Sequence, residues 1–597
     1  MSDALLTVEN LTKSYGEKLL FEDISFGINA GQKTALIARN GYGKSTLLNI
    51  LTGKVLQDEG KITFRGDVKM AYLPQSPEFH ANQTVRSFVY AAQRPEHEDP
   101  WTFEQRIEEI LGRLKIDQLL DKPMEILSGG EQKKVALSRI LIDDTNLLIL
   151  DEPTNHLDIE MIEWLEEFLS RQRLAILMVT HDRYFLDNVC QDILELDNAR
   201  LYHYRGTYDY YLDKKAERVY NEKVEVEKAK SLYKTELDWM RRMPQARGTK
   251  AQARIDAFYK LEEKAHTRFD ESKPQLTVKT ERIGGKILEM YNVTKSYEGR
   301  KMVDDFCYCF KKGEKIGIVG PNGIGKSTFL NLLTEQLRPD SGHVVVGQTI
   351  QFGFYTQGGM KAKDDQRVID IVKDVAEEIE LDNGKSMSAH QFLTYFGFDN
   401  TTQYNYFGNL SGGERRRLYL LKVLMANPNF LILDEPTNDL DIYTLEILEQ
   451  FLKDYKGCLV IVSHDRSFMD HLVDHLFIFE GDGKIKDYHS NYTEYRQQKA
   501  LQRKNEIKQQ KAEKPVYERV RSNKPKATFK EKREYEQLTA DIDALTQERS
   551  DLEAMLSGAK PATTEEITNA SQRIGEIIAL LDEKEMRWLE LDEIVNG

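Results

Sequence analysis

Two glycine-rich stretches of this 597-residue chain hold a lysine followed by two hydroxyl residues. The second stretch, GPNGIGKST from residue 320 to residue 328, fits the phosphate-loop pattern throughout. In such a loop the glycines let backbone amides close on nucleotide phosphates, the lysine adds positive charge, and the first hydroxyl can hold Mg²⁺. The following helix should present its N-terminus to the anion. The predicted binding residues are Gly320, Asn322, Gly323, Gly325, Lys326, Ser327 and Thr328.

The first stretch, ARNGYGKST from residue 38 to residue 46, departs from this pattern. Ala38 replaces the first glycine, and the bulky Tyr42 lies within the loop. A Cβ at Ala38 is expected to strain the turn. We therefore expect this loop to bind nucleotide, but with binding or hydrolysis that differs from that at the second loop. The predicted binding residues are Asn40, Gly41, Gly43, Lys44, Ser45 and Thr46.

Acidic pairs end two buried-strand patterns, LLILDE and FLILDE. Asp151 and Asp434 should act on Mg²⁺, mostly through water. The adjacent Glu152 and Glu435 are candidates to polarise the attacking water. The next apolar strands end at histidines, which could contact the γ-phosphate. A lone histidine at a strand end is usually structural, but His181 and His464 follow the acids at the same spacing in both copies.

These features belong to an internal repeat. Tyr15, Lys44 and Gln75 recur 282 positions later, and Leu127, Glu152 and His181 recur 283 positions later. A shared offset indicates a duplicated domain. The predicted organisation is a first domain at 1–208, a helical linker at 209–283, a second domain at 284–497, a flexible basic segment at 498–534 and a C-terminal coiled coil at 535–597. Each domain opens with alternating residues that predict antiparallel strands.

Composition narrows the class of protein. No run of about 18 apolar residues predicts a transmembrane helix, and the N-terminus lacks a secretory signal. Four scattered cysteines do not form a disulfide framework, so a reduced cytoplasmic setting is the simplest expectation. The net charge of -15 argues against a chain that coats nucleic acid everywhere, although local basic surfaces exist.

Both domains also carry the sequence LSGGE, followed by an amphipathic helix, a buried strand and DEPTNHLD or DEPTNDLD. With two such domains and no membrane span, the chain resembles the ABC-F family of ATP-binding-cassette (ABC) ATPases. The resemblance covers essentially the whole chain. It implies an α/β fold of two P-loop cassettes with antiparallel β subdomains, a long helical hairpin linker and a C-terminal coiled-coil hairpin. It also implies ATP hydrolysis with ATP and Mg²⁺ as ligands.

In that family the cassettes close face to face on two ATP molecules. The phosphate loop of the first cassette, with Gln75, would then work with Ser411, Gly412 and Gly413 of the second. The loop of the second, with Gln357, would work with Ser128, Gly129 and Gly130 of the first. Gln75 and Gln357 would join Ser45, Asp151, Ser327 and Asp434 around Mg²⁺. Tyr15 and Tyr297 would stack on adenine. Because both cassettes lie on one chain, a monomer is expected.

The linker carries a basic tip. From Trp239 to Ile255 it contains no acid, and its basic residues are Arg241, Arg242, Arg247, Lys250 and Arg254. A solvated helical hairpin is the plain interpretation. An acid-free tip in an acidic protein favours contact with a phosphate backbone, most simply RNA. The tip resembles the ABC-F linker motif, which implies contact with tRNA at the ribosome.

The tail offers a second nucleic-acid candidate. Residues 496–536 hold 14 Lys+Arg against 6 Asp+Glu, and heptad spacings follow in two segments. A dimerisation or spacer coil is one interpretation. The other is a resemblance to the Uup-type subgroup, whose coiled coil binds DNA, including branched DNA.

The sequence therefore favours an ATPase that acts at the ribosome as a translation or assembly factor, with DNA binding through the tail. The alternative is an ATPase that acts mainly on branched DNA. A transporter ATPase subunit ranks lower, because a charged hairpin joins the two domains. A ribosome-protecting resistance factor also ranks lower, because the tip of that hairpin is short.

Overall fold

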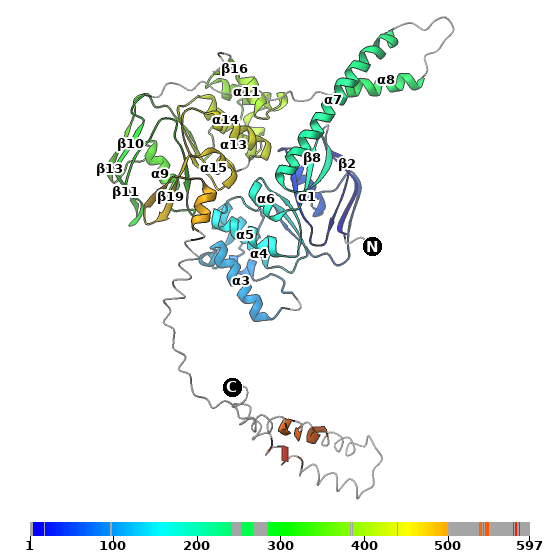
Figure 1. Cartoon of the computed structure of the whole chain (residues 1–597), viewed down its shortest axis with the longest axis vertical. Coiled ribbons are helices and arrows are strands. Elements are labelled where there is room, and N and C mark those ends of the chain that lie inside the picture. Colours follow the sequence, from blue (N-terminus) through cyan, green and yellow to red (C-terminus); the bar gives the residue numbers. More distant parts are fainter. Residues whose placement is uncertain are drawn as a thin grey trace. The chain divides into compact units, whose positions relative to one another are not determined.

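The computed structural model describes two compact units, Met1–Gln497 and Gln498–Gly597 (Figure 1). The described residues are 4–241 except 17, 81 and 96–97; 252–266; 284–499 except 357, 382–383, 385 and 439; and 501, 537–539, 541–542, 544–547, 577, 580–581 and 584. The first unit holds two α/β cassettes and a helical linker. None of the described helices is long and apolar enough to cross a membrane.

Cassette 1 is built on a six-stranded sheet in the order β5-β6-β7-β3-β8-β9, in which β9 alone is antiparallel to its neighbour. A second, antiparallel sheet has the order β2-β1-β4. The strands are β1 (Ala4–Tyr15), β2 (Lys18–Asn29), β3 (Lys33–Ala38), β4 (Glu59–Phe64), β5 (Met70–Leu73), β6 (Leu147–Asp151), β7 (Ala175–Val179), β8 (Asp192–Asp197) and β9 (Arg200–Arg205). The α-helices are α1 (Lys44–Leu51), α2 (Val85–Val89), α3 (Pro100–Leu114), α4 (Gly129–Ile142), α5 (Ile159–Arg171) and α6 (Arg183–Val189).

Cassette 2 repeats this plan, with a six-stranded sheet β14-β17-β18-β12-β19-β20 and an antiparallel sheet β11-β10-β13. It adds the short hairpin β15-β16. The strands are β10 (Leu288–Tyr297), β11 (Arg300–Cys309), β12 (Lys315–Val319), β13 (Ser341–Val346), β14 (Phe352–Tyr355), β15 (Glu378–Glu380), β16 (Ser386–Ser388), β17 (Phe430–Asp434), β18 (Cys458–Val462), β19 (His475–Gly481) and β20 (Lys484–Tyr488). The α-helices are α9 (Lys326–Leu333), α10 (Val368–Lys373), α11 (Ala389–Tyr395), α12 (Asn400–Tyr404), α13 (Gly412–Met425), α14 (Ile442–Asp454) and α15 (Arg466–Leu472).

The central strands are covered on both faces, which explains their continuous apolar sequence. In β6, Leu147 and Ile149 pack with α1 and the antiparallel sheet, whereas Leu148 and Leu150 pack with α4, α5 and α6. Every residue of β6 is buried, as expected for parallel strands with helices on both sides. The predicted α/β fold of two cassettes with antiparallel subdomains is confirmed. The sheet brings the loops at its strand ends to one edge, where the candidate sites lie.

The linker contains the helices α7 (Tyr208–Arg241) and α8 (Gln252–Ala265). They pack together: the Tyr233 ring stacks on Phe258 at 5.4 Å between centroids, and its hydroxyl donates to Glu262 over 2.9 Å. Most of the basic tip predicted between Trp239 and Ile255 lies outside the described residues. So do Arg242, Arg247 and Lys250, together with the side chain of Arg254.

In the second unit the described residues are helical, and Lys584 forms an ion pair with Asp541 over 2.6 Å. Most of the predicted coiled coil and nearly all of the basic segment lie outside the described residues.

The two cassettes meet through reciprocal ion pairs between their helices. Arg466 of α15 contacts Glu166 of α5 over 2.9 Å, and Arg183 of α6 contacts Glu449 of α14 over 2.9 Å. Arg466 is only 2% exposed, and Asp182 lies 3.8 Å from the same guanidinium. These pairs lie at equivalent positions, 283 residues apart, so the interface has approximate two-fold symmetry.

We predict that Arg466→Ala destabilises the chain by about 3–5 kcal/mol, because it leaves the buried Glu166 carboxylate without its partner. Calorimetric unfolding should show a clearly lower midpoint. Arg171→Ala is the matched control, since its ion pair with Glu167 is exposed and should contribute no more than about 1 kcal/mol. Equal midpoints for the two variants would contradict the prediction.

Candidate nucleotide sites

Each phosphate loop has the conformation that an anion requires. Gly43 and Gly325 precede α1 and α9 with φ of 95° and 115°, a backbone region that favours glycine. No side chain caps the start of either helix, so the first backbone amides of each helix face the loop without a side-chain acceptor. Lys44 and Lys326 lie over the loops and donate to main-chain oxygens over 2.8 and 2.7 Å. This cradle of amides and buried ammonium groups fits a nucleotide phosphate.

The strain expected at Ala38 is not found. Ala38 is the last residue of β3, and it is not among the residues with positive φ. Its counterpart Gly320 is tightly enclosed, since a Cβ there would lie 2.8 Å from Cβ of Phe479. The residue paired with Ala38 is Leu196, which takes the place that Phe479 has beside Gly320 in cassette 2. Ala38 therefore has ordinary strand backbone, and the loop has no left-handed strain at this position.

A hydroxyl and a carboxylate meet at the end of each loop. Ser45 Oγ donates to Asp151 Oδ2 over 3.0 Å, and Ser327 Oγ donates to Asp434 Oδ2 over 3.1 Å. Burial raises the pKa of Asp151 to about 6, helped by the neighbouring Glu152, and burial also raises the pKa of Asp434. Buried carboxylate and hydroxyl oxygens of this kind fit Mg²⁺, which would compensate their charge.

The two candidate bases have a strained backbone. Glu152 and Glu435 adopt φ of 53° and 52°, and their amides donate to the neighbouring strand, at Val179 and Val462, over 2.9 and 2.8 Å. Left-handed backbone is uncommon for glutamate and costs about 1–3 kcal/mol when the structure imposes it. In both cassettes the strained turn lies beside the phosphate loop, so a constraint on side-chain position is the simplest explanation.

The histidines contact these glutamates, although the two copies differ. His181 Nε2 lies 2.8 Å from Glu152 Oε1, while His464 Nε2 lies 3.3 Å from Glu435 Oε1 and also near Lys326. Burial raises the pKa of Glu152, but the charges of His181 and Lys44 outweigh it, and the pKa stays below its ordinary value. Burial raises the pKa of Glu435 to about 8. Both oxygens of Glu435 are buried without a hydrogen-bond partner.

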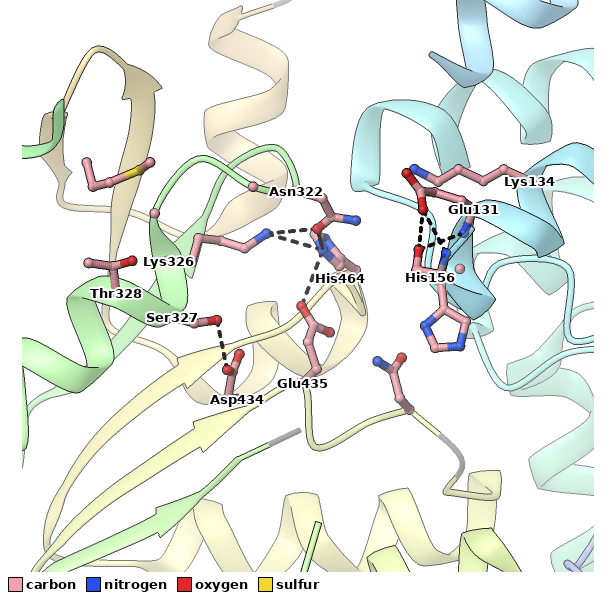
Figure 2. Close-up of a pocket in the computed structure, with 16 residues that line it drawn as sticks. Glu131, Lys134, His156, Asn322, Lys326, Ser327, Thr328, Asp434, Glu435 and His464 are labelled. Carbon is pink, nitrogen blue, oxygen red and sulfur yellow. Dashed lines mark hydrogen bonds and ion pairs between the residues drawn. The ribbon is translucent and has the colours of Figure 1, made fainter. Parts of the chain in front are cut away.

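The third component of each site comes from the other cassette. Ser128 and Ser411 begin α4 and α13, and each forms a reciprocal capping box, with Glu131 and Glu414 respectively. These helix starts face the phosphate loops across two cavities of about 660 and 830 Å³. Figure 2 shows Lys326 and Glu435 on one side of the smaller cavity, with Lys134 of cassette 1 on the other side.

Site 1, the larger cavity, collects all the residues predicted for it. They are Tyr15, Asn40, Gly41, Gly43, Lys44, Ser45, Thr46, Gln75, Asp151, Glu152 and His181, with Ser411, Gly412 and Gly413 from cassette 2. Site 2, the smaller cavity, is lined by Ser128, Gly130, Asn322, Gly323, Gly325, Lys326, Ser327, Thr328, Asp434, Glu435 and His464. Tyr297, Gly320 and Gly129 are described but do not line it, and Gln357 lies outside the described residues.

Sequence reasoning missed several cationic residues of the sites. Arg416 and Arg417 line site 1, and Lys134 lines site 2. The signal was available, because the two signatures continue as LSGGEQKK and LSGGERRR. His156, which lines both cavities, was also missed.

The two sites also differ in the contacts of the aspartate that lies three residues after each DEPTN motif, Asp158 or Asp441. Asp441 Oδ2 accepts a hydrogen bond from the Asn40 amide in loop 1 over 2.7 Å. Burial would raise the pKa of Asp441, but Lys44 and the Asn40 amide lower it to about 2. The equivalent Asp158 instead contacts Lys115 within its own cassette over 3.2 Å. Site 1 therefore has a direct contact between its phosphate loop and the opposite cassette.

Family models match both cassettes, the linker and the tail. The ABC transporter family matches residues 21–155 and 303–438, and a second profile of the same description matches 194–278. A profile described as the ABC transporter C-terminal domain matches residues 526–593.

Relatives match along nearly the full chain. It is 38% identical to the uncharacterised ABC transporter ATP-binding protein YfmR of Bacillus subtilis, over 98% of this chain and 100% of that protein. It is 34% identical to the ATP-binding protein Uup of Haemophilus influenzae, over 99% of both. It is 35% identical to the energy-dependent translational throttle protein EttA of Escherichia coli, over 80% of this chain and 93% of that protein.

Solved structures support the fold. A crystal structure of the archaeal ribosome recycling factor aABCE1 with the ribosomal stalk protein aP1 aligns with a TM-score of 0.57. The sequence identity is 20%, and the alignment covers 80% of this chain and 88% of that chain.

We predict that the two sites respond differently to pH. Because the pKa of Glu435 is raised to about 8, its carboxyl should become protonated, and unable to accept a proton, as the pH falls through that value. The pKa of Glu152 is lowered, so Glu152 should stay ionised. In the Glu152→Gln variant, kcat/KM for the remaining site 2 should fall between about pH 9 and about pH 6. The Glu435→Gln variant, which retains site 1, is the matched control; a superimposable profile would contradict the prediction.

Proposed function

Because the chain belongs to the ABC-F family of ATP-binding-cassette ATPases, we propose that it couples ATP hydrolysis at two composite sites to engagement of the translating ribosome. The chain is an ATPase, as its two ABC domains and its full-length relatives indicate.

The observation that carries the proposal is the composite geometry of the cavities. Site 1 combines Lys44 of cassette 1 with Ser411 of cassette 2, and site 2 combines Lys326 with Ser128. Only the joined cassettes surround a nucleotide, so ATP binding should hold them together and loss of the γ-phosphate should release them. Since both halves lie on one chain, we propose that the active form is a monomer.

Each side chain has a proposed role in hydrolysis. Lys44 and Lys326 bind the β- and γ-phosphates, and the opposite signature helix completes the anion site at its N-terminus. Glu152 and Glu435 orient the attacking water and accept its proton, while His181 and His464 hold these carboxylates and face the γ-phosphate. Mg²⁺, held by Ser45 with Asp151 and by Ser327 with Asp434, would neutralise charge on the phosphates.

The link to translation rests on a relative and on the linker. EttA, named as a translational throttle, shares 35% identity over 80% of this chain. The helix α7 extends from cassette 1 to the exposed Arg241, at the start of the acid-free basic tip. We propose that this tip contacts ribosomal RNA or tRNA through phosphates, with Arg242, Arg247, Lys250 and Arg254 contributing. Binding of branched DNA through the tail is the competing outcome of the test below.

We predict that Glu152→Gln combined with Glu435→Gln lowers ATP turnover by about 10²–10⁴-fold, the usual contribution of a general base. ATP should remain bound, since no phosphate contact is removed. Phosphate release and retention of labelled ATP measure the two effects. Glu108→Gln, at an exposed position on α3, is the matched control and should turn over like the wild type. Wild-type turnover by the double variant would refute the assignment of the base.

We predict that the double variant with ATP sediments with ribosomes, and that Arg241→Gln, Arg242→Gln and Arg247→Gln together weaken this binding. Three lost phosphate contacts should reduce the salt slope of log affinity by about three. Arg113→Gln, Arg171→Gln and Arg173→Gln remove equal charge from exposed cassette positions and form the control. Weak sedimentation, with a preference for a four-way DNA junction over linear duplex at the same salt, would favour the DNA function instead.

A further inference from the structure

A fully buried carboxylate connects three parts of the first unit. Glu195, on β8 of cassette 1, has 0% exposure. Its Oε1 contacts Lys215 Nζ at 2.7 Å and accepts from the hydroxyls of Tyr211 and Tyr443 over 2.9 and 2.8 Å. Its Oε2 contacts Arg218 Nη1 at 2.8 Å. Lys215, Arg218 and Tyr211 belong to the base of the linker helix α7, whereas Tyr443 belongs to α14 of cassette 2.

The charges in this cluster are well compensated. Burial raises the pKa of Glu195, but the charges of Lys215 and Arg218 outweigh it and hold the pKa below its ordinary value. The Lys215 ammonium also lies 3.8 Å from the centre of the Tyr443 ring. A buried charge with this many partners tolerates little displacement, because each lost contact leaves a polar group with neither a protein partner nor water to replace it. Helix α7, strand β8 and the start of α14 are thus fixed to one another.

The start of α14 also contacts the phosphate loop of site 1. Asp441, two residues before Tyr443, accepts the Asn40 amide hydrogen bond, and the Arg39 guanidinium lies 5.4 Å from the centre of the Tyr443 ring. On the other side, the Tyr208 hydroxyl at the base of α7 donates to Glu446 of α14 over 2.7 Å. The first turn of α14 therefore lies between loop 1 and the base of the linker.

Site 2 lacks the part of this arrangement that depends on Glu195 and Tyr443. The position equivalent to Tyr443 is Glu160, and the strand position equivalent to Glu195 is Ile478, so neither the hydroxyl nor the buried carboxylate is present. Asp158, equivalent to Asp441, forms its ion pair with Lys115 of its own cassette, and only its charge acts on Lys326 of the opposite phosphate loop. The connection to the linker helix is a property of site 1.

We propose that Glu195 and Tyr443 are positioning residues for ATP at site 1, holding Asp441 on the phosphate loop and making this site, but not site 2, depend on the position of α7. The inference rests on the proposed composite sites and adds a specific route between one of them and the linker. Signals from a linker-bound partner would reach the chemistry through site 1.

The test is Tyr443→Phe measured in two single-site backgrounds of the full chain. With Glu435→Gln, which leaves site 1, we expect KM for ATP to rise about tenfold, equivalent to about 1.4 kcal/mol, with a smaller change in kcat. With Glu152→Gln, which leaves site 2, neither constant should change. Tyr492→Phe is the matched control, because its hydroxyl makes a similar contact to Glu163 on the other half of the interface, over 3.2 Å. It should leave site 1 unaffected.

A role in general interface stability would change both sites alike, and that result, or no change at either site, would overturn the inference. Lys215→Met offers a second route from the side of α7 and should produce the same site 1 effect if Tyr443→Phe does not fold. Failure of the proposed function is separately visible. In that case the variants Glu152→Gln and Glu435→Gln, with Tyr443 unchanged, would hydrolyse ATP like the wild type.

Discussion

Neither cassette of this chain can surround the phosphates of a nucleotide alone. The loop amides and the lysine lie on one cassette, and the helix N-terminus that completes the anion site lies on the other. In the proposed mechanism anion binding would therefore also be domain association, and each ATP would bridge the interface. The buried pair Arg466–Glu166 and the partly buried pair Arg183–Glu449 fit this requirement, because they fix the register of the two cassettes next to the sites. A charged interface of this kind favours a defined geometry over tight permanent packing.

The approximate symmetry of the interface makes its departures informative. The phosphate loops differ at Ala38 and Gly320, and the neighbouring strand differs beside them, at Leu196 and Phe479. The two candidate bases differ in the distance to their histidines and, as a result, in the direction of their pKa shifts. The acid after each DEPTN motif has a partner across the interface in one site and within its own cassette in the other. The two sites therefore share one arrangement of residues but differ from each other at each of these points.

Much of this could be predicted from the sequence, because phosphate loops, signatures and strand-end acids are local patterns whose spacing fixes their place on the sheet. The pairing of loops with opposite signatures came from the family resemblance. The sequence could not reveal Glu195, whose importance depends on Tyr443 from a distant segment, since a single acid within a strand pattern carries no such signal. It also led to the wrong expectation of strain at Ala38, because the loop pattern does not show that this residue ends a strand with ordinary backbone.

The length of α7 has a mechanical consequence. Its 34 residues span about 51 Å, and its anchored contacts lie within the first turns, beside the cassettes. The base of such a helix is fixed to the cassettes, and the rest of the helix amplifies any rotation of that base. If the base of α7 turned by about 10° together with the elements to which it is fixed, the far end would move by roughly 9 Å. Ångström-scale changes beside a γ-phosphate would thereby become displacements comparable to the width of a helix.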